Sequence, residues 1–197
     1  MTLRDFSTSQ CSSSTSCQIA RMASKKAYVF VLDLGSTLGD CHNGRSITDL
    51  DWGMQWVWDK MATIMARGLK GDNVGVVAFR TDETNNEQAE EDPSYNNISV
   101  LKELGMLEMD DLRNLQAQVK PSATEEGDVI SALIIATQKI AEFTTLKTGK
   151  PGKFERYIYL LTDGQGAADG DDLDPVIDKL NEVGIELTVM CGALNMS

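Results

Sequence analysis

Short apolar runs alternate with amphipathic helical patterns along most of the chain, and this order constrains the fold more than any other feature. The runs AYVFVLD, NVGVVAFR, RYIYLLTDG and IELTVM are apolar nearly throughout, which is typical of strands covered on both faces. NISVLKEL alternates apolar and polar residues and predicts an edge strand. Helical patterns lie between the strands, over about residues 51–67, 109–119, 125–146 and 173–183. The order predicts an α/β fold, a doubly wound, mostly parallel sheet with helices on both faces.

The first 26 residues differ in kind from residues 27–197. They are dense in Ser and Thr, lack hydrophobic periodicity and carry four basic side chains against Asp5 alone. This composition predicts a disordered tail in front of a single domain. Two alternatives stay open for the tail: a mitochondrial transit peptide, or an extension that precedes a natural start at Met22.

The acidic balance of the chain limits its partners. Its 18 Lys and Arg residues stand against 30 Asp and Glu residues, a formal net charge of −12. Broad phosphate binding depends on Lys and Arg displacing counterions, so this chain is not expected to grip DNA over a wide surface. Its longest apolar runs are much shorter than the ~18–20 residues of a membrane span, so no membrane partner is expected.

The four cysteines form no recognisable metal or disulfide pattern. Cys11, Cys17, Cys41 and Cys191 include no C-x-x-C pair, and the single histidine, His42, lies beside Cys41. A domain with this much apolar sequence does not need disulfides, so we expect a reducing compartment and no zinc. His42 has no acid or thiol partner at a useful spacing, so no nucleophilic site is expected there.

Polar side chains follow two of the predicted strands and open one of the predicted helices. Asp33 ends the first strand and Asp163 ends RYIYLLTDG, while Thr37 and Thr124 lie in nearby turns. The carboxyl ends of parallel strands meet at one edge of a sheet, so these four residues are expected around one point. Their hard oxygen ligands predict Mg²⁺, bound partly through water. The alternative is that Asp33 and Asp163 only cap the turns that follow them.

The segments DLGST, SATEEGD and LLTDG, in this order of strands and helices, resemble the von Willebrand factor A domain. The metal-ion-dependent adhesion site of that family uses the motif D-x-S-x-S, a Thr and a later Asp. Asp33 and Thr37 match the first and fifth motif positions, and Thr124 and Asp163 match the other two. The third position, Ser in the family, is Gly35 here. The resemblance therefore implies a degenerate metal site that lacks one direct ligand.

A more detailed resemblance covers about residues 27–189. The segments VLDLGSTLGDCHNGR, SITDLDWGMQWVWDKM, NVGVVAFRTDETNN, YNNISVLKELG and GDVISAL are similar to the N-terminal domain of the larger subunit of the Ku heterodimer, in its fungal form. DETNN after a strand and the Trp-rich helix are not general features of von Willebrand A folds. The family continues past the region of CGALNMS, so the resemblance implies a domain that lacks its last strand and helix.

The Ku resemblance implies work at broken DNA. Ku binds DNA ends as a ring of two subunits, acts in double-strand break repair by non-homologous end joining, and helps maintain telomeres. The implied partners are the smaller Ku subunit, end-joining and telomere proteins, and DNA ends through domains absent from this chain. The N-terminal domain itself is expected at the periphery as a protein-interaction surface. The implied location is the nucleus, at the chromosome and the telomere.

No catalytic residue and no resident cofactor are expected. Family members are catalogued as subunits of an ATP-dependent DNA helicase, but this sequence lacks the phosphate loop G-x-x-x-x-G-K followed by Ser or Thr. ATP is therefore implied only by that cataloguing, and Mg²⁺ only by the degenerate site. As an enzyme motif, DLGST lacks the second acid of the phosphotransfer pattern D-x-D-x-T. The competing interpretation is an adhesion-type von Willebrand A module, in which Mg²⁺ is completed by a partner carboxylate.

Two aromatic residues on the first helix are candidate partner contacts. Trp52 and Trp56 lie opposite the apolar stripe of the helix, and exposed aromatic residues are favoured interface anchors. The alternative is that a neighbouring loop or helix covers both rings. The acidic run from Asp82 to Asp92 is interpreted as a solvated loop. Its functional alternative is repulsion of DNA or attraction of a basic partner segment.

Overall fold

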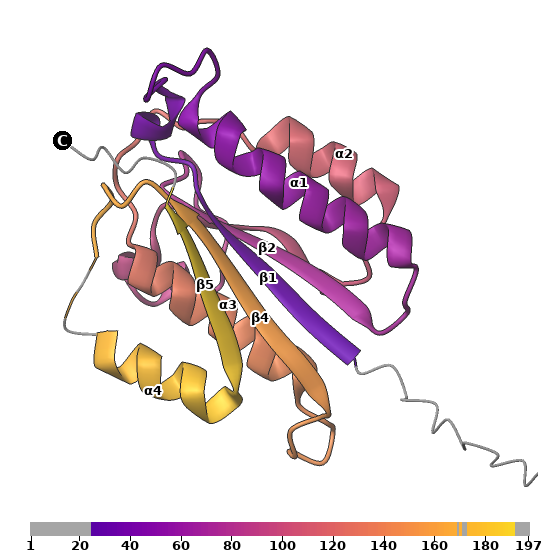
Figure 1. Ribbon diagram of the computed structural model, residues 1–197. Coiled ribbons are helices and arrows are strands. Elements are labelled where there is room, and N and C mark those ends of the chain that lie inside the picture. Colours follow the sequence, from indigo (N-terminus) through magenta and orange to yellow (C-terminus); the bar gives the residue numbers. More distant parts are fainter. Residues whose placement is uncertain (1–24, 169, 171–172, 192–197) are drawn as a thin grey trace, which may run out of the picture.

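The structure, a computed structural model, describes residues 25–168, 170 and 173–191. The strands within these residues are β1 (Lys25–Asp33), β2 (Asp72–Phe79), β3 (Ile98–Gly105), β4 (Phe154–Thr162) and β5 (Ile185–Cys191). They form one sheet in the order β3-β2-β1-β4-β5 (Figure 1). All neighbours in it are parallel except β3, which pairs antiparallel to β2 at one edge. The predicted mostly parallel sheet with NISVLKEL at an edge is confirmed.

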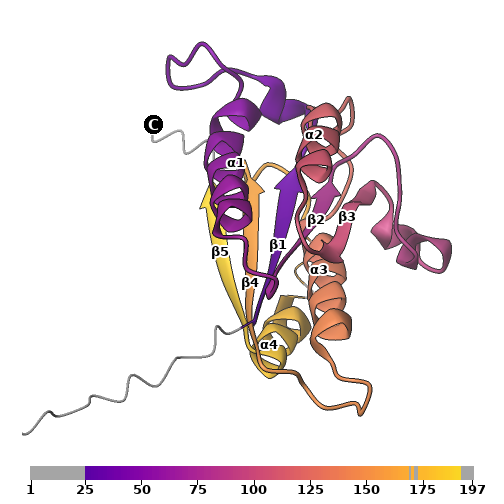
Figure 2. The same cartoon turned by 90° about the vertical axis from the view of Figure 1, so that its right-hand side faces the viewer.

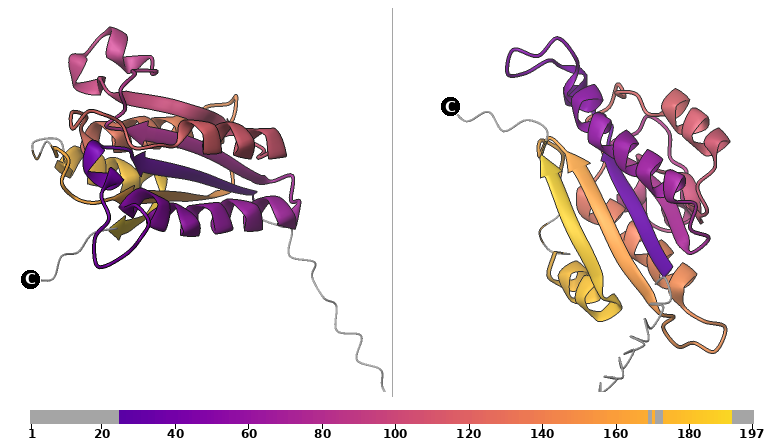
Figure 3. Two further views of the ribbon diagram at one scale, coloured as in Figure 1. Left: turned by 90° about the horizontal axis from the view of Figure 1, so that it is seen from above. Right: turned by 45° about the vertical axis from the view of Figure 1, so that its right-hand side comes forward.

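Helices cover both faces of the sheet, as predicted (Figure 2, Figure 3). One face carries α1 (Asp49–Arg67) and α2 (Met109–Gln118), and the other carries α3 (Val129–Thr144) and α4 (Leu173–Val183). The short 3-10 helices η1 (Ser36–Gly39), η2 (Gln88–Glu90) and η3 (Pro93–Tyr95) lie in connecting loops. In the described part of the chain, no helix has both the length and the apolar character needed to cross a membrane.

Each face of the sheet has its own hydrophobic core. Along β1, Tyr28, Phe30 and Leu32 belong to the core under α1 and α2, whereas Val29 and Val31 belong to the core under α3 and α4. This division follows from the two-residue period of a strand. The predicted apolar stripe of α1 is buried at Met54, Val57, Met61 and Ile64 and partly buried at Trp58 and Met65. Because helices cover both faces of the sheet, polar side chains that could form a site are expected at the ends of the strands.

Several predicted boundaries differ from the structure by a few residues, and two of them have clear local reasons. β1 begins at Lys25 rather than at residue 27, because Lys26 extends the ladder and donates its N–H to the carbonyl of Gly71. α3 begins at Val129 rather than near residue 125, because the Asp128 carboxylate accepts the N–H of Ser131 and caps the helix there. The predicted disordered tail over residues 1–26 otherwise lies outside the described residues.

Gly53 lets α1 approach the sheet closely. A Cβ atom at this position would lie 2.6 Å from Cδ1 of Leu161 in β4. Real Cβ contacts do not come that close, so a side chain at this position forces Leu161 or the helix to move. The glycine therefore sets the distance between α1 and β4, the strand that Asp163 follows.

We expect Gly53→Leu to lower the free energy of unfolding by about 1–3 kcal/mol, because the larger side chain overpacks the contact with Leu161. The higher helix propensity of leucine offsets part of this loss. Gly105→Leu is the control, since a Cβ atom there meets nothing within 4 Å. Denaturant unfolding of both variants measures the difference, and equal losses at the two positions would contradict the close contact.

Candidate functional site

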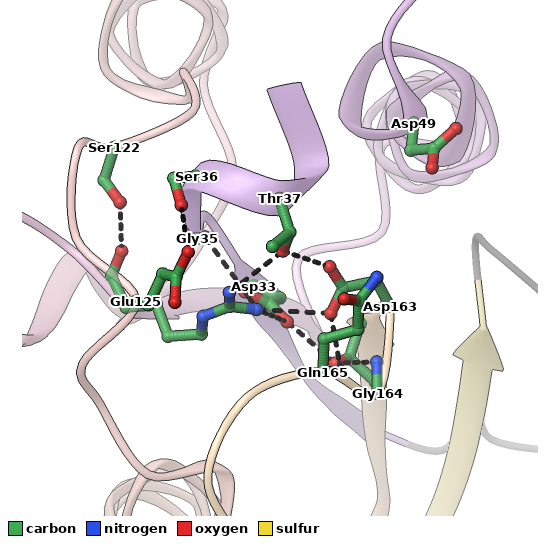
Figure 4. Close-up of polar contacts among 12 residues, drawn as sticks. Asp33, Gly35, Ser36, Thr37, Asp49, Ser122, Glu125, Asp163, Gly164 and Gln165 are labelled. Atoms are coloured by element: carbon green, nitrogen blue, oxygen red, sulfur yellow. Dashed lines mark hydrogen bonds and ion pairs between the residues drawn. The ribbon is translucent and has the colours of Figure 1, made fainter. Parts of the chain in front are cut away.

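Asp33 and Asp163 meet at the carboxyl edge of the sheet. β1 and β4 are paired in parallel, so the residues at their carboxyl ends share this edge. The Thr162 hydroxyl donates to Oδ2 of Asp33 over 2.8 Å. Thr37, in η1, donates its hydroxyl to Oδ2 of Asp163. Figure 4 shows Asp33, Thr37 and Asp163 close to one another. The structure thus brings together three of the four residues that the sequence predicted as metal ligands.

The guanidinium of Arg80 lies between the two carboxylates. Its Nη1 is 3.2 Å from both carboxylate oxygens of Asp33 and 3.2 Å from Oδ1 of Asp163. Its Nη2 donates to the Thr37 hydroxyl over 2.9 Å. Arg80 is only 1% exposed and Asp33 is fully buried. The cluster of Asp33, Thr37, Arg80 and Asp163, called the Arg80 cluster below, therefore contains a cation supplied by the chain itself.

Sequence reasoning missed Arg80, which it placed only as the last residue of the strand NVGVVAFR. Arg80 follows β2 directly, and β2 pairs in parallel with β1, so both strands end at the same edge of the sheet. A charged residue at the end of an otherwise apolar strand was the available signal. Such a residue is expected to find a partner when its strand is buried.

The chain around Arg80 leaves room for its side chain. Arg80 has a φ of 56°, in the left-handed region, and its carbonyl accepts the Ser122 hydroxyl over 2.6 Å. A Cβ atom on Gly35 would lie 2.1 Å from Cζ of Arg80. Added Cβ atoms on Gly127 and Gly166 would lie 2.7 Å from its backbone N and 3.0 Å from its Cδ. A side chain at position 35 is incompatible with Arg80 in this place.

Charge in the Arg80 cluster is not fully balanced. Burial raises the pKa of Asp33 above its ordinary value, and the neighbouring carboxylate of Asp163 adds to the rise. Hydrogen bonds from the Gly35 N–H and the Thr162 hydroxyl, together with the charge of Arg80, oppose the rise without cancelling it. Within the described residues, the buried Nε of Arg80 also has no hydrogen-bond partner. One guanidinium therefore compensates two buried carboxylates only in part.

As arranged, these residues do not fit a divalent cation. Mg²⁺ takes oxygen ligands at about 2.0–2.1 Å. Nη1 of Arg80 fills the place between Asp33 and Asp163 where oxygens of both carboxylates would converge on an ion. A metal ion there would also be repelled by the guanidinium at short range.

Thr124, the fourth predicted ligand, accepts hydrogen bonds from backbone N–H groups instead. Its hydroxyl accepts the N–H of Glu126 over 3.0 Å, and its carbonyl accepts the N–H of Ser36. The predicted alternative role of the aspartates is also present. Asp33 accepts the N–H of Gly35, and Asp163 accepts the N–H of Gln165. Turn capping and the contact with Arg80 therefore occur together.

Another buried carboxylate, Asp49, holds the loop that precedes α1. Its Oδ2 lies 2.6 Å from Nδ1 of His42, and its Oδ1 accepts Nη2 of Arg45 over 2.5 Å. The expectation that His42 lacks an acid partner is wrong, because the loop folds back onto the first residue of α1. Cys41 beside it is a free, exposed thiol. The contact between His42 and Asp49 fixes the loop.

Trp52 and Trp56 are accessible on α1, with 44% and 41% of their surfaces exposed. Trp56 packs edge-on against Tyr159 with ring centroids 5.2 Å apart, and the Lys60 ammonium lies over its ring. The Arg45 guanidinium lies over Trp52, 4.5 Å from the ring centroid. Both rings line a groove with Gly53, Gln55, Asp59, Leu161, Thr188, Met190 and Cys191, called the Trp52–Trp56 groove below. A docking role for the two rings stays a prediction.

The acidic run between β2 and β3 is solvated, as predicted. Its carboxylate residues are all exposed: Asp82, Glu83, Glu87, Glu90, Glu91 and Asp92. Asp82 accepts the N–H of Ala123 over 2.9 Å, and the Asn86 side chain donates to the carbonyl of Ile98 over 2.7 Å. These contacts fix the path of the loop while leaving its negative charges in water.

The ionisation of Asp49 is linked to stability. Burial alone raises the pKa of Asp49, but hydrogen bonds from Arg45 and His42 outweigh burial and hold the pKa below 3.8. A lowered pKa in the folded state means that the ionised carboxylate stabilises the fold at all pH values above the ordinary one. This contribution is lost as the pH falls through the lowered pKa.

We therefore expect Asp49→Asn to lower the free energy of unfolding by about 1–3 kcal/mol at neutral pH, because the amide has no charge to pair with the Arg45 guanidinium. The difference from the natural chain should shrink when the pH falls below 3.8 toward the lowered pKa. Urea unfolding at several pH values measures it. Asp110→Asn is the control, since Asp110 pairs with Arg113 in full solvent. A loss that does not change with pH would contradict the assigned role of Asp49.

Sequence comparisons with known proteins cover nearly all of the described fold. Residues 27–193 match the family model described as the Ku70/Ku80 N-terminal alpha/beta domain. Proteins named ATP-dependent DNA helicase II subunit 2 are 47% identical over 170 residues in Neurospora crassa and 33% identical over 168 residues in Schizosaccharomyces pombe. The two matches cover 86% and 85% of this chain but 23% of each relative, so the chain spans about a quarter of their length. The resemblance carried by DETNN and the Trp-rich helix is confirmed, and the chain belongs to the Ku70/Ku80 N-terminal alpha/beta domain family.

Proposed function

We propose that this chain is the N-terminal protein-interaction domain of a Ku-type heterodimer that binds DNA ends. The observation that carries the proposal is the family match over residues 27–193, which includes every strand and helix of the described fold except the first two residues of β1. The partners proposed are the smaller Ku subunit and proteins of end joining and telomere maintenance. The proposed setting is double-strand break repair by non-homologous end joining, in the nucleus and at chromosome ends.

We assign the contact with DNA to other parts of the protein. The chain has a formal net charge of −12, and the acidic loop between β2 and β3 presents its carboxylates to solvent. Both features oppose binding of a phosphate backbone. The relatives are about four times as long as the part that matches this chain, which leaves room for a separate DNA-binding region. Acidity and a role at DNA ends are therefore compatible.

The competing adhesion-type function is less well supported. An adhesion site needs a metal ion that a partner carboxylate can complete. Here Arg80 contacts both aspartates that would hold the metal. Helicase activity appears in the names of the relatives. This sequence lacks the phosphate loop G-x-x-x-x-G-K followed by Ser or Thr, which would bind ATP. Recognition of proteins remains the role that the domain supports best.

The first test concerns DNA. We expect the chain to bind a fluorescent duplex end with a Kd weaker than about 10⁻⁴ M at physiological salt, the weak limit of non-specific binding. Fluorescence anisotropy measures the affinity, and a basic DNA-binding domain serves as the positive control. Sub-micromolar end binding by this chain would overturn the assignment of DNA contact to other regions.

The second test concerns the Trp52–Trp56 groove. We expect Trp52→Ala with Trp56→Ala to weaken binding of the smaller Ku subunit or an end-joining protein by roughly 10- to 100-fold, as loss of an aromatic anchor does. Phe143→Ala is a matched control, because Phe143 is 40% exposed and packs edge-on against Phe154, on the opposite face of the sheet. Surface plasmon resonance measures both. Equal affinities of the double variant and the natural chain would exclude this groove as the docking surface.

A further inference from the structure

Arg80 places a positive charge where the sequence predicts a metal ion. Its guanidinium contacts Asp33, Thr37 and Asp163, which are three of the four predicted ligands. We propose that Arg80 is a resident cation that replaces the divalent metal of this site. In consequence, the carboxyl edge of the sheet is ordered without metal, and removal of the Arg80 side chain opens a site for Mg²⁺ or Mn²⁺.

The arrangement of oxygen atoms supports the expectation that removal of the Arg80 side chain opens a metal site. Nη1 of Arg80 lies 3.2 Å from each of three carboxylate oxygens, two from Asp33 and one from Asp163. Carboxylate and hydroxyl oxygens are the ligands that hard divalent cations prefer. Without the guanidinium, the same oxygens would surround a space with two negative charges and no cation. A small divalent ion is the simplest species that satisfies both charges at once.

Position 35 supports the replacement independently. The adhesion motif has Ser where this chain has Gly35, and a Cβ atom there would lie 2.1 Å from Cζ of Arg80. A side chain at position 35 and the guanidinium of Arg80 in its present position therefore exclude each other. The missing ligand and the buried arginine have a single explanation, because the space that a Ser side chain needs is occupied by the guanidinium. Gly35 and Arg80, the two residues that distinguish this site from a metal site, therefore depend on each other for space.

The replacement has a consequence for partner binding. A metal site exchanges its ion with solvent, whereas a covalently attached guanidinium is always present. Partner binding by this domain should accordingly be insensitive to chelators and to divalent ions. This consequence rests on the proposed function, whereas the exchange of arginine for metal can be tested on the chain alone. Failure of one test is therefore distinguishable from failure of the other.

The test uses Arg80→Gly, because glycine tolerates the φ of 56° at this position and leaves no side chain. The natural chain and Arg80→Gly are titrated with MnCl₂ by calorimetry, and the melting temperature of each is measured with MnCl₂ and with EDTA. Arg113→Ala is the control for removal of an arginine, since Arg113 lies exposed on α2. Arg80→Gly combined with Asp163→Asn tests whether the predicted ligands hold the ion.

We expect no binding of Mn²⁺ by the natural chain or by Arg113→Ala, and binding by Arg80→Gly that is lost with Asp163→Asn. With free Mn²⁺ at about 100 times its Kd, the melting temperature of Arg80→Gly should rise by roughly 5–10 °C. If Arg80→Gly is unfolded in EDTA, recovery of its circular dichroism spectrum on addition of MnCl₂ supports the proposal, and no recovery contradicts it. The proposal is also overturned if the natural chain binds Mn²⁺ through Asp33, or if folded Arg80→Gly does not bind it.

A serine at position 35 adds a second measurement. Gly35→Ser alone should lower the melting temperature, because its Cβ atom overlaps Arg80. In the Arg80→Gly background the same change should be tolerated and should tighten Mn²⁺ binding by several-fold, because a hydroxyl ligand is added. Equal effects of Gly35→Ser in both backgrounds would show that positions 35 and 80 are not coupled.

Discussion

The contact of Arg80 with Asp33 and Asp163 orders the carboxyl edge of the sheet. Asp33 ends β1, Arg80 follows β2 and Asp163 follows β4, so the cluster ties three strands together at their carboxyl ends. Thr37 adds η1, and Ser122 adds the loop before α3 through the carbonyl of Arg80. Removing one partner of a buried ion pair typically costs about 3–5 kcal/mol, because the other charge is left uncompensated. The loops of this edge therefore depend on one buried side chain.

The shape of the guanidinium explains why an arginine, rather than a lysine, suits this place. A planar fork with several N–H donors reaches both carboxylates and the Thr37 hydroxyl at the same time, whereas an ammonium is a point charge on a flexible stem. The fit is incomplete, since the pKa of Asp33 stays raised and Nε is unpaired among the described residues. The incomplete pairing of these groups costs free energy, so the surrounding packing must hold the cluster in place. Here that packing comes from Gly35 and from the strands that position the aspartates.

Most of the fold was predictable from the sequence because its signals are local. The period of the strands, the stripe of α1 and the edge position of NISVLKEL each follow from residues close together in the chain. The convergence of Asp33 and Asp163 was also predictable, because strand ends meet in any parallel sheet. The partner of these aspartates was not predictable, because NVGVVAFR signals only that a charge at the end of a buried strand needs a partner, and not which groups Arg80 contacts. The same reason hid the contact of His42 with Asp49, which exists only because a loop folds back on α1.

The surface of the domain separates two kinds of chemistry. The acidic loop joins β2 to β3, at one edge of the sheet, whereas the Trp52–Trp56 groove includes Met190 of β5, at the other edge. Figure 2 shows β3 and β5 on opposite sides of the sheet, with α1 lying toward β4 and β5. A protein bound in the groove would meet the cations of Arg45 and Lys60 over the two rings, away from the concentrated carboxylates. The proposed docking of a protein in the groove is therefore compatible with an acidic loop that repels nucleic acid, because the sheet holds the two surfaces apart.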